Sequence, residues 1–441
     1  MNHTRAYRLP RLCLPRPGID LRKWAVIACD QHTAEPDYWQ RVAAEVGDAP
    51  STLQLIYPEA FLGEADGAAR IARLQAAMRA YLAGGLLAEH TGAVYVERRI
   101  GARVRRGLML ELDLAHYDFR PGSASLIRPT EQTIVARLAP RIEVRRGAAL
   151  ELPHILVLID DPGCTVIEPL AAARARFAPL YDTELMLGGG QVAGWVADAA
   201  AAQQACAALD LLADPAAFAA RHGVAPGTPV MQFAMGDGNH SLATAKAIWE
   251  AMAATAPAGH PCRHALVEVE NIHDPALEFE PIHRLLFGLQ ADPREWLAQA
   301  FGARLALTDL PSAPALAAAV RAAAAGEQVA GLIGPGPRCT LLRLADPPST
   351  LAVGSLQPLL DQWLADGRMH EIDYVHGDDT LARLAQQPGC AGVLLPTLDK
   401  SALLHMVVRE GVLPRKTFSM GEAHEKRYYV EARRLDGGAA P

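Results

Sequence analysis

The sequence lacks long apolar runs and an excess of positive charge, and both absences narrow the possible functions. No apolar stretch in the 441 residues is long enough to cross a membrane as a helix. Residues 1–18 carry Arg and Pro and no apolar core, so they do not predict a signal peptide. The formal net charge is −7, whereas a nucleic-acid-binding protein needs a concentrated basic face. We therefore expect a cytoplasmic protein with no nucleic acid and no membrane among its partners.

Cysteine is sparse, and several familiar catalytic motifs are missing. The seven cysteines are widely spaced and form no Cys-x-x-Cys pair, so neither a disulfide framework nor a zinc knuckle is expected. There is no Gly-x-x-x-x-Gly-Lys-Ser/Thr loop, no Gly-x-Ser-x-Gly elbow and no His-Glu-x-x-His helix. These absences argue against a P-loop enzyme, an α/β-hydrolase and a zinc protease.

What the sequence does contain is an alternation of helix-like and strand-like patterns, half of its residues being apolar. This alternation, together with one predicted hairpin, indicates an α/β protein with a mixed sheet. The length exceeds that of one ordinary core, so we expect two domains or one core with large insertions. We place the boundary near Gly288, giving a catalytic α/β domain over residues 1–290 and a C-terminal α/β domain over residues 291–441.

The expected elements follow from apolar periodicity and from turn residues. Helices are predicted over residues 35–46, 68–83, 242–252 and 401–410, and mostly helical structure over 292–327. Strands are predicted over residues 21–29, 152–159, 228–235, 266–273, 277–279, 391–395 and 427–433, with a hairpin formed by 93–99 and 106–114. Gly188–Gly190 is interpreted as a connection between helices, and Glu268, Glu270 and His273 as the polar face of one strand.

The main candidate site is the turn Gly236-Asp237-Gly238-Asn239-His240-Ser241, between a predicted buried strand and a predicted helix. Gly236 and Gly238 allow positive φ angles and close approach of a ligand, and Ser241 can cap the helix. The unpaired N–H groups of a helix start attract anions, and a carboxylate beside a phosphate is a usual way to hold Mg²⁺. A polar capping turn without a ligand is the alternative.

Three further clusters are weaker candidates. Residues 128–133 place Glu131 where a strand passes into a helix, as a general base or merely a first-turn carboxylate. Residues 413–419 form a loop with two cations and two hydroxyls, which either binds anions or is simply solvated. His283 and Arg284 could reach an anion or pair with Glu278 or Glu280. Asp160 and Asp161 end a predicted central strand, a position that is typical of functional sites in α/β proteins and equally of ordinary turns.

Four of these stretches, in order, resemble the family called domain of unknown function 1015. They are Trp24–Gln31, Ser125–Thr133, Leu152–Pro162 and Gly236–Ser241, and the resemblance extends from about residue 21 to about residue 435. More distantly, the chain resembles the archaeal free serine kinases, which share the fold of the ParB and sulfiredoxin group. That resemblance implies a mixed-sheet core with large helical insertions and a C-terminal α/β part.

The kinase resemblance also implies roles for particular residues. The kinases carry Pro-His-Glu, Asp-Gly-His-His-Arg and Pro-Lys-Thr-Thr, which correspond here to 129–131, 237–241 and 414–417. It implies that Glu131 activates a substrate hydroxyl, that Asp237 holds the metal or orients groups, and that His240 contacts the transferring phosphoryl group. The remaining implied contacts are Gly236, Gly238, Asn239, Ser241 and Arg284 for phosphate or nucleotide, and Thr133, His283, Lys416 and Thr417 for substrate.

The sequence departs from the kinase pattern at two positions of the turn. Asn239 replaces the first His and Ser241 replaces the Arg, which removes a charge-assisted phosphate contact. Arg284 and Lys416 are the candidates to replace that contact.

Three functions are compared on this basis. The first is a kinase that uses Mg²⁺ and ATP or ADP to phosphorylate a small hydroxylated metabolite, with free L-serine as the first guess. The second is a nucleotide-binding switch or partner module, and the third is a metal-dependent hydrolase using Asp237, His240 and a carboxylate such as Asp160. A small-molecule substrate and a nucleotide are the expected partners, with a homodimer as a further candidate assembly.

Overall fold

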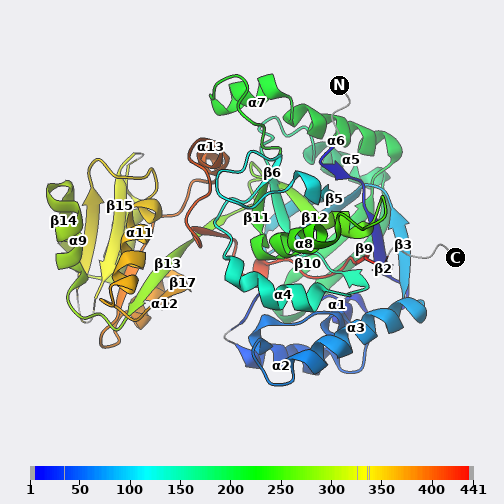
Figure 1. Cartoon of the computed structure of the whole chain (residues 1–441), viewed down its shortest axis with the longest axis horizontal. Helices are drawn as coiled ribbons and strands as arrows, with labels where there is room; N and C mark the ends of the chain where they lie inside the picture. Colours follow the sequence, from blue (N-terminus) through cyan, green and yellow to red (C-terminus); the bar gives the residue numbers. More distant parts are fainter. Residues whose placement is uncertain (1–4, 34, 325, 335, 337, 437–441) are drawn as a thin grey trace. The chain divides into compact units, whose positions relative to one another are not determined.

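The computed structural model describes residues 5–33, 35–324, 326–334, 336 and 338–436, and it divides into two compact units. Unit 1 comprises Met1–Glu278, Leu404–Val412 and Ala423–Pro441, and unit 2 comprises Phe279–Leu403 and Leu413–Glu422. Figure 1 shows the helices and strands of both. The functional division into a catalytic domain before residue 290 and a C-terminal domain after it stays a prediction. The mixed α/β class is confirmed.

Unit 1 is built on a nine-stranded mixed sheet, counted over the described residues, with the strand order β6-β11-β8-β12-β5-β4-β10-β9 and β1 paired to β5. β6 runs parallel to β11 and β8 runs parallel to β12, whereas the other neighbours are antiparallel. The strands are β1 (Tyr7–Arg8), β4 (Val94–Ile100), β5 (Arg103–Asp113), β6 (Ile127–Arg128), β8 (Leu156–Ile159), β9 (Ala178–Leu185), β10 (Gly190–Val196), β11 (Phe233–Asp237) and β12 (His264–Asn271). Two short ribbons pair β2 (Arg11–Pro15) with β3 (Leu87–Thr91) and β7 (Leu150–Glu151) with β20 (Arg433–Arg434).

Helices cover both faces of this sheet because each strand has apolar residues on both sides. Tyr95, Leu108 and Leu110 pack on one side with α5, α6 and α8, and Val94, Val96 and Met109 pack on the other with α1, α2 and α3. Figure 1 shows α1–α3 grouped at one side of unit 1 and α5–α7 at the opposite side. These helices are α1 (Leu21–Trp24), α2 (Pro36–Val46), α3 (Gly67–Ala83), α4 (Leu138–Arg145), α5 (Glu168–Ala173), α6 (Ala199–Leu212), α7 (Pro215–His222) and α8 (Asn239–Met252).

Unit 2 is a separate antiparallel sheet with its own helices. Its strand order is β14-β16-β15-β18-β13-β17, with β19 paired to β13. The strands are β13 (Phe279–Phe287), β14 (Leu305–Leu310), β15 (Gln328–Ile333), β16 (Cys339–Leu344), β17 (Glu371–His376), β18 (Ala391–Leu394) and β19 (Phe418–Met420). The helices are α9 (Pro293–Phe301), α10 (Ala313–Arg321), α11 (Ala352–Ala365) and α12 (Asp378–Leu384), followed by α13 (Lys400–Glu410), which runs from unit 2 into unit 1.

Several predicted elements are confirmed where apolar periodicity or turn residues dominated the local sequence. The helices at 35–46 and 68–83 are α2 and α3, the helix at 401–410 is α13, and the strand at 391–395 is β18. The hairpin is β4–β5, and residue 97 pairs with residue 106. None of the described helices is long and apolar enough to cross a membrane.

Other predictions were wrong because local chemistry or distant partners decided the structure. Residues 21–24 form helix α1 rather than a strand, because the Asp20 side chain accepts hydrogen bonds from the N–H groups of Arg22 and Lys23. Gly188–Gly190 leads from strand β9 into β10, which begins at Gly190, and does not connect helices. Residues 292–327 are mostly helical, as predicted, but they also contain strand β14, which pairs along its whole length with β16.

Further differences concern strand bounds. The strands predicted at 152–159 and 228–235 are confined to Leu156–Ile159 and Phe233–Asp237, and the short strand predicted at 277–279 is β13, which starts at Phe279. In 427–433 only Arg433 belongs to a strand, and Tyr428 and Ala432 make isolated bridges to Ile27 and Cys13.

The carboxylates of β12 are buried, which corrects the prediction that they mark a polar strand face. Glu268 is 3% exposed and Glu270 is fully buried. Glu268 accepts a hydrogen bond from Arg427 at 2.7 Å, and Glu270 lies 2.7 Å from the Arg105 Nε. Burial raises the pKa of Glu270 to about 8, although the Arg105 charge opposes that shift. The strand is therefore central, and both carboxyl groups lie against arginines inside the protein.

The last segment of unit 1 completes this buried network of charges. Arg427 also donates to Glu431 at 2.7 Å, and Arg433 donates to Glu151 at 2.8 Å and to Glu111 at 3.1 Å. Burial alone would raise the pKa of Glu151, but Arg433 and Arg145 hold it at about 2. The segment is thus fixed in the core by arginines and not by a long strand.

Gly107 of β5 provides the space that Glu268 occupies. A Cβ on Gly107 would lie 2.6 Å from the Glu268 Cγ and 2.8 Å from its Cδ. We expect Gly107→Ala to lower the free energy of unfolding by about 2–3 kcal/mol, because Glu268 must move away from Arg427. Urea unfolding measures this, with Gly67→Ala as the matched control, since its Cβ would meet only the Tyr57 hydroxyl at 3.4 Å. Equal effects of the two substitutions would contradict the prediction.

Candidate functional site

The turn between β11 and α8 depends on one glycine in a left-handed conformation. Gly238 has φ 79° and ψ 26° and stands at the N-cap position of α8. A Cβ there would lie 3.1 Å from the Ile155 Cα, so both the conformation and the close approach favour glycine. The chain therefore reverses tightly at Gly238, and the residues around it lie at the end of the sheet.

The helix begins earlier than the apolar pattern predicted. α8 starts at Asn239, and the N–H groups of Ser241 and Leu242 donate to the Gly238 carbonyl at 3.0 and 3.1 Å. Ser241 is therefore inside the first turn and does not cap the helix, which corrects the sequence prediction. Its hydroxyl instead lies 2.9 Å from the His154 Nε2.

Glu131 lies beside this turn because β6 and β11 are parallel neighbours. Two hydrogen bonds connect the residues on either side of Glu131 to the turn: the Thr130 hydroxyl donates to the Met235 carbonyl at 2.7 Å, and the Ile134 N–H donates to the His240 Nε2 at 3.4 Å. The parallel pairing places the ends of both strands at the same edge of the sheet. Glu131, Asp237 and His240 are thus brought to one region of unit 1.

Asp237 is held by a lysine that sequence reasoning missed. Its Oδ1 accepts the Gly238 N–H at 2.8 Å, and its Oδ2 lies 2.9 Å from the Lys426 Nζ. Lys426 is 6% exposed, whereas the Asp237 side chain is 25% exposed. Burial would raise the pKa of Asp237, but the Lys426 charge and these hydrogen bonds lower it. The two residues are 189 positions apart, so no local pattern indicated the pair.

Two polar atoms at this place are buried without a hydrogen-bond partner among the described residues. They are the Thr133 Oγ1 and the Asn239 Oδ1, one from each of the two segments that meet here. Buried polar groups are nearly always hydrogen-bonded, so such atoms need an explanation. A bound polar molecule at the turn would supply partners for both.

The predicted substrate loop, residues 413–419, belongs to unit 2, and hydrogen bonds and an ion pair fix its conformation. Lys416 has φ 56°, and its carbonyl accepts a hydrogen bond from Arg284 at 2.8 Å. The Thr417 hydroxyl donates to the Pro414 carbonyl at 2.7 Å, and Arg415 makes a bidentate pair with Asp361 at 2.6 and 3.0 Å. The roles of Lys416 and Thr417 in binding substrate stay predictions.

His283 and Arg284 are fully buried inside unit 2. The His283 Nδ1 accepts the Leu395 N–H at 3.1 Å, so its Nε2 donates to Asp378 at 3.0 Å. Arg284 donates to Gln357 and to backbone carbonyls, including that of Arg415. Its predicted neighbour Glu278 pairs with Arg103 instead. The hydrogen bonds from Arg284 to the carbonyls of Arg415 and Lys416 therefore hold the loop of residues 413–419 in place.

Asp160 lies at the opposite end of β8 from the turn. Asp237 pairs with Leu156 at the start of β8, and Asp160 follows its last residue. Asp160 is bonded to His273 at 2.8 Å and to Arg221 at 3.1 Å. The strand register therefore separates Asp160 from Asp237 and His240, so Asp160 cannot be the carboxylate of the predicted hydrolase. The described residues contain no group of three His, Cys, Asp or Glu that could hold a metal ion.

The chain belongs to the family described as protein of unknown function (DUF1015), whose model matches residues 13–387. This confirms the family predicted from the sequence motifs. No match was found among curated proteins.

Solved structures that are similar to this chain share little of its sequence. A free serine kinase in complex with AMP is 13% identical with a TM-score of 0.39, over 75% of this chain and 92% of that chain. A conserved hypothetical protein from Pyrococcus furiosus is 14% identical with a TM-score of 0.36, over 75% and 96%. SbnI with a C-terminal truncation from Staphylococcus aureus is 12% identical with a TM-score of 0.36, over 74% and 87%. We therefore base the function on this chain's own residues.

The Asp237–Lys426 pair predicts a pH-dependent coupling. Because the pKa of Asp237 is lowered in the folded protein, its contribution to stability is present above the pKa of unfolded aspartate, about 4, and is lost as the pH falls through the lower folded value. A double-mutant cycle of Lys426→Met and Asp237→Asn, followed by urea unfolding, should give a coupling free energy of about 2 kcal/mol at pH 7. At pH values below the folded pKa the coupling should approach zero, and a coupling that does not change with pH would contradict it.

Proposed function

We propose that unit 1 transfers a phosphoryl group from a nucleotide to the hydroxyl of a small metabolite, with free L-serine as the first substrate to test. The observation that carries this proposal is the pair of hydrogen bonds on either side of Glu131, from Thr130 to Met235 and from Ile134 to His240. They hold the chain segment that carries Glu131 next to a turn with the chemistry of an anion site. Phosphoryl transfer requires positioning and charge neutralisation more than covalent catalysis.

The turn supplies the groups that would hold the phosphates. The first turn of the 14-residue helix α8 offers the positive end of its dipole at the backbone of Asn239, since the Gly238 N–H already donates to Asp237. Lys426 adds a positive charge beside Asp237, in a chain whose turn has Ser241 where the kinases have Arg. Because Lys426 already lies at the turn, Arg284 is not needed as a phosphate contact, and we assign His283 and Arg284 to the internal structure of unit 2.

We propose His240 as a hydrogen-bond donor to the transferring group. The Ile134 N–H donates to its Nε2, so a neutral His240 carries its hydrogen on Nδ1. We assign this Nδ1–H to an oxygen of the phosphoryl group. The bond to Ile134 fixes the ring orientation, which connects the Glu131 segment directly to the phosphate-binding residues.

In the proposed reaction Glu131 acts as the general base. Glu131 takes the proton of the substrate hydroxyl, the hydroxyl oxygen forms a bond to the terminal phosphorus, and the bond from that phosphorus to the bridging oxygen breaks. The products are the phosphorylated metabolite and the nucleotide shortened by one phosphate, ADP from ATP or AMP from ADP. The Thr133 hydroxyl and the Asn239 amide oxygen, both lacking partners among the described residues, are assigned to substrate and nucleotide.

A magnesium ion fits the carboxylate chemistry of the turn. Mg²⁺ is usually bound by one or two carboxylates together with phosphate oxygens and water, and it would neutralise phosphate charge. Asp237 is the residue that would hold it, and Lys426 keeps that carboxylate ionised. Lys416 and Thr417 of unit 2 remain our proposed substrate contacts.

The test is a direct assay of the full chain with Mg²⁺, ATP or ADP, and a panel of hydroxylated amino acids that includes L-serine. Mass spectrometry should detect a phosphorylated product with at least one donor. Glu131→Gln should lower its rate of formation at least about 100-fold, because a general base typically contributes 10²–10⁴. The same variant should bind the nucleotide within about twofold of wild type, measured by calorimetry.

The matched control is Glu143→Gln, which removes an exposed carboxylate from helix α4 of the same unit. It should leave the rate within about twofold of wild type. Nucleotide binding without any phosphorylated product would reject the kinase and leave the nucleotide-binding module as the function. Absence of nucleotide binding would reject both.

A further inference from the structure

A cavity of about 130 Å³ lies in unit 1 on the Ser241 side of helix α8. It is lined by residues of α4, the first turns of α8, the segment Leu150–Ile155 and the segment Leu55–Leu62. Its walls are mainly apolar, from Leu55, Met78, Val144, Leu152, Ile155 and Leu266. Glu131, Asp237 and His240 are not among the described residues that line it, so it is distinct from the proposed phosphate site.

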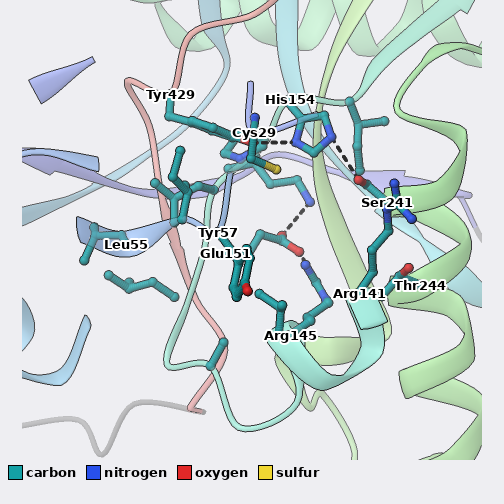
Figure 2. A pocket seen from close by; sticks show the side chains of 18 of the residues that line it. Cys29, Leu55, Tyr57, Arg141, Arg145, Glu151, His154, Ser241, Thr244 and Tyr429 are labelled. Atoms are coloured by element: carbon teal, nitrogen blue, oxygen red, sulfur yellow. Dashed lines mark hydrogen bonds and ion pairs between the residues drawn. The ribbon is translucent and has the colours of Figure 1, made fainter. Parts of the chain in front are cut away.

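A chain of hydrogen bonds ends at the cavity wall, as Figure 2 shows for His154, Ser241 and Tyr429. The Cys29 N–H donates to the Tyr429 hydroxyl oxygen at 3.0 Å, the Tyr429 hydroxyl lies 2.9 Å from the His154 Nδ1, and the His154 Nε2 lies 2.9 Å from the Ser241 Oγ. Tyr429 is 1% exposed and His154 is 8% exposed. The chain therefore connects the protein interior to a hydroxyl in the cavity.

The hydroxyl of Tyr429 decides the direction of these hydrogen bonds. Its oxygen already accepts from the Cys29 N–H, and its single hydrogen can go to the His154 Nδ1 or to the Cys29 side chain. The imidazole nitrogen is the stronger acceptor, since sulfur accepts hydrogen bonds only weakly, so we assign the hydrogen to the His154 Nδ1. The His154 Nε2 then carries the ring hydrogen and donates to the Ser241 oxygen. The hydrogen of Ser241 is thereby left to donate to a molecule in the cavity.

The arginines and glutamates that line the cavity are paired with one another, and the Asp30 Oδ2 lies 3.8 Å from the His154 Nε2. Arg141 contacts Glu59 at 2.5 Å, and Arg145 is paired with Glu151 (Figure 2). A charged ligand would have to separate one of these pairs or bring an unmatched charge into an apolar space, which costs several kcal/mol per ion. A neutral molecule avoids that cost, so the cavity favours an uncharged ligand.

We propose that this cavity binds a single neutral ring that carries a hydrogen-bond acceptor, and that Ser241 donates to that acceptor. The volume supports one ring, since an engineered cavity of about 150 Å³ in another protein binds benzene. The ring is either a free small molecule or the base of a nucleotide whose phosphates lie at the turn. The proposal depends on the cavity and on the direction of the hydrogen bonds, not on phosphoryl transfer.

The first experiment is an NMR titration of the full chain with benzamide and benzoate, which have the same size and differ in charge. Benzamide should bind at least about tenfold more tightly than benzoate. Ser241→Ala should weaken benzamide binding about three- to tenfold, the range of one hydrogen bond, and should change toluene binding less than twofold. Val144→Phe, which fills the cavity, should remove binding of both rings.

The matched control is Thr244→Val, which removes a second hydroxyl from the same cavity wall. The Thr244 hydroxyl already donates to the His240 carbonyl at 2.7 Å, so this variant should keep benzamide affinity within about twofold. Absence of benzamide binding, equal or tighter binding of benzoate, or equal effects of Ser241→Ala and Thr244→Val would each overturn the proposal.

Titrations with adenine and AMP identify the source of the ring. If both bind and both are weakened by Ser241→Ala, the ring is the base of a nucleotide; if benzamide alone shows that dependence, it is a separate small molecule. Either result supports the cavity proposal. Because these are binding measurements, loss of phosphoryl transfer in the earlier assay does not affect them, and the two proposals can fail separately.

Discussion

The buried pairing of arginines with carboxylates is the interaction on which unit 1 depends. Arg427 is bonded to Glu268 and Glu431, and Arg433 to Glu151 and Glu111, each of these six side chains being at most 5% exposed. Buried charges are costly to desolvate, and breaking such a pair leaves the remaining charge uncompensated. The carboxylates of the sheet and the arginines of the last segment therefore require each other, and the segment has one position in the core.

Residues 426–433 at the end of unit 1 contact residues on both sides of the first turn of α8. Lys426, next to Arg427, reaches Asp237 at the proposed phosphate site, and Tyr429 reaches His154 at the cavity. Neighbouring residues on a helix point about 100° apart, so His240 and Ser241 face different surroundings. One short stretch of chain thereby sets the charge of one site and the hydrogen-bond direction of the other.

The sequence predicted the parts of this arrangement that depend on local chemistry. The period of apolar residues located α2 and α3, and two glycines in three residues located the turn at Gly238. It could not predict Lys426, His154 or Tyr429 at the sites, because their partners lie 87 or more positions away. The alternating carboxylates of β12 were misassigned for a related reason, since alternation shows that residues share a face and not whether water or arginine covers it.

The position of the arginines along the chain has a consequence for folding during synthesis. Glu111, Glu151 and Glu268 leave the ribosome long before Arg427 and Arg433, with the whole of unit 2 made in between. Until those arginines emerge, the central strand β12 carries carboxylates that cannot be buried at low cost. We expect the nascent sheet to stay partly open and hydrated until Arg427 and Arg433 have emerged from the ribosome.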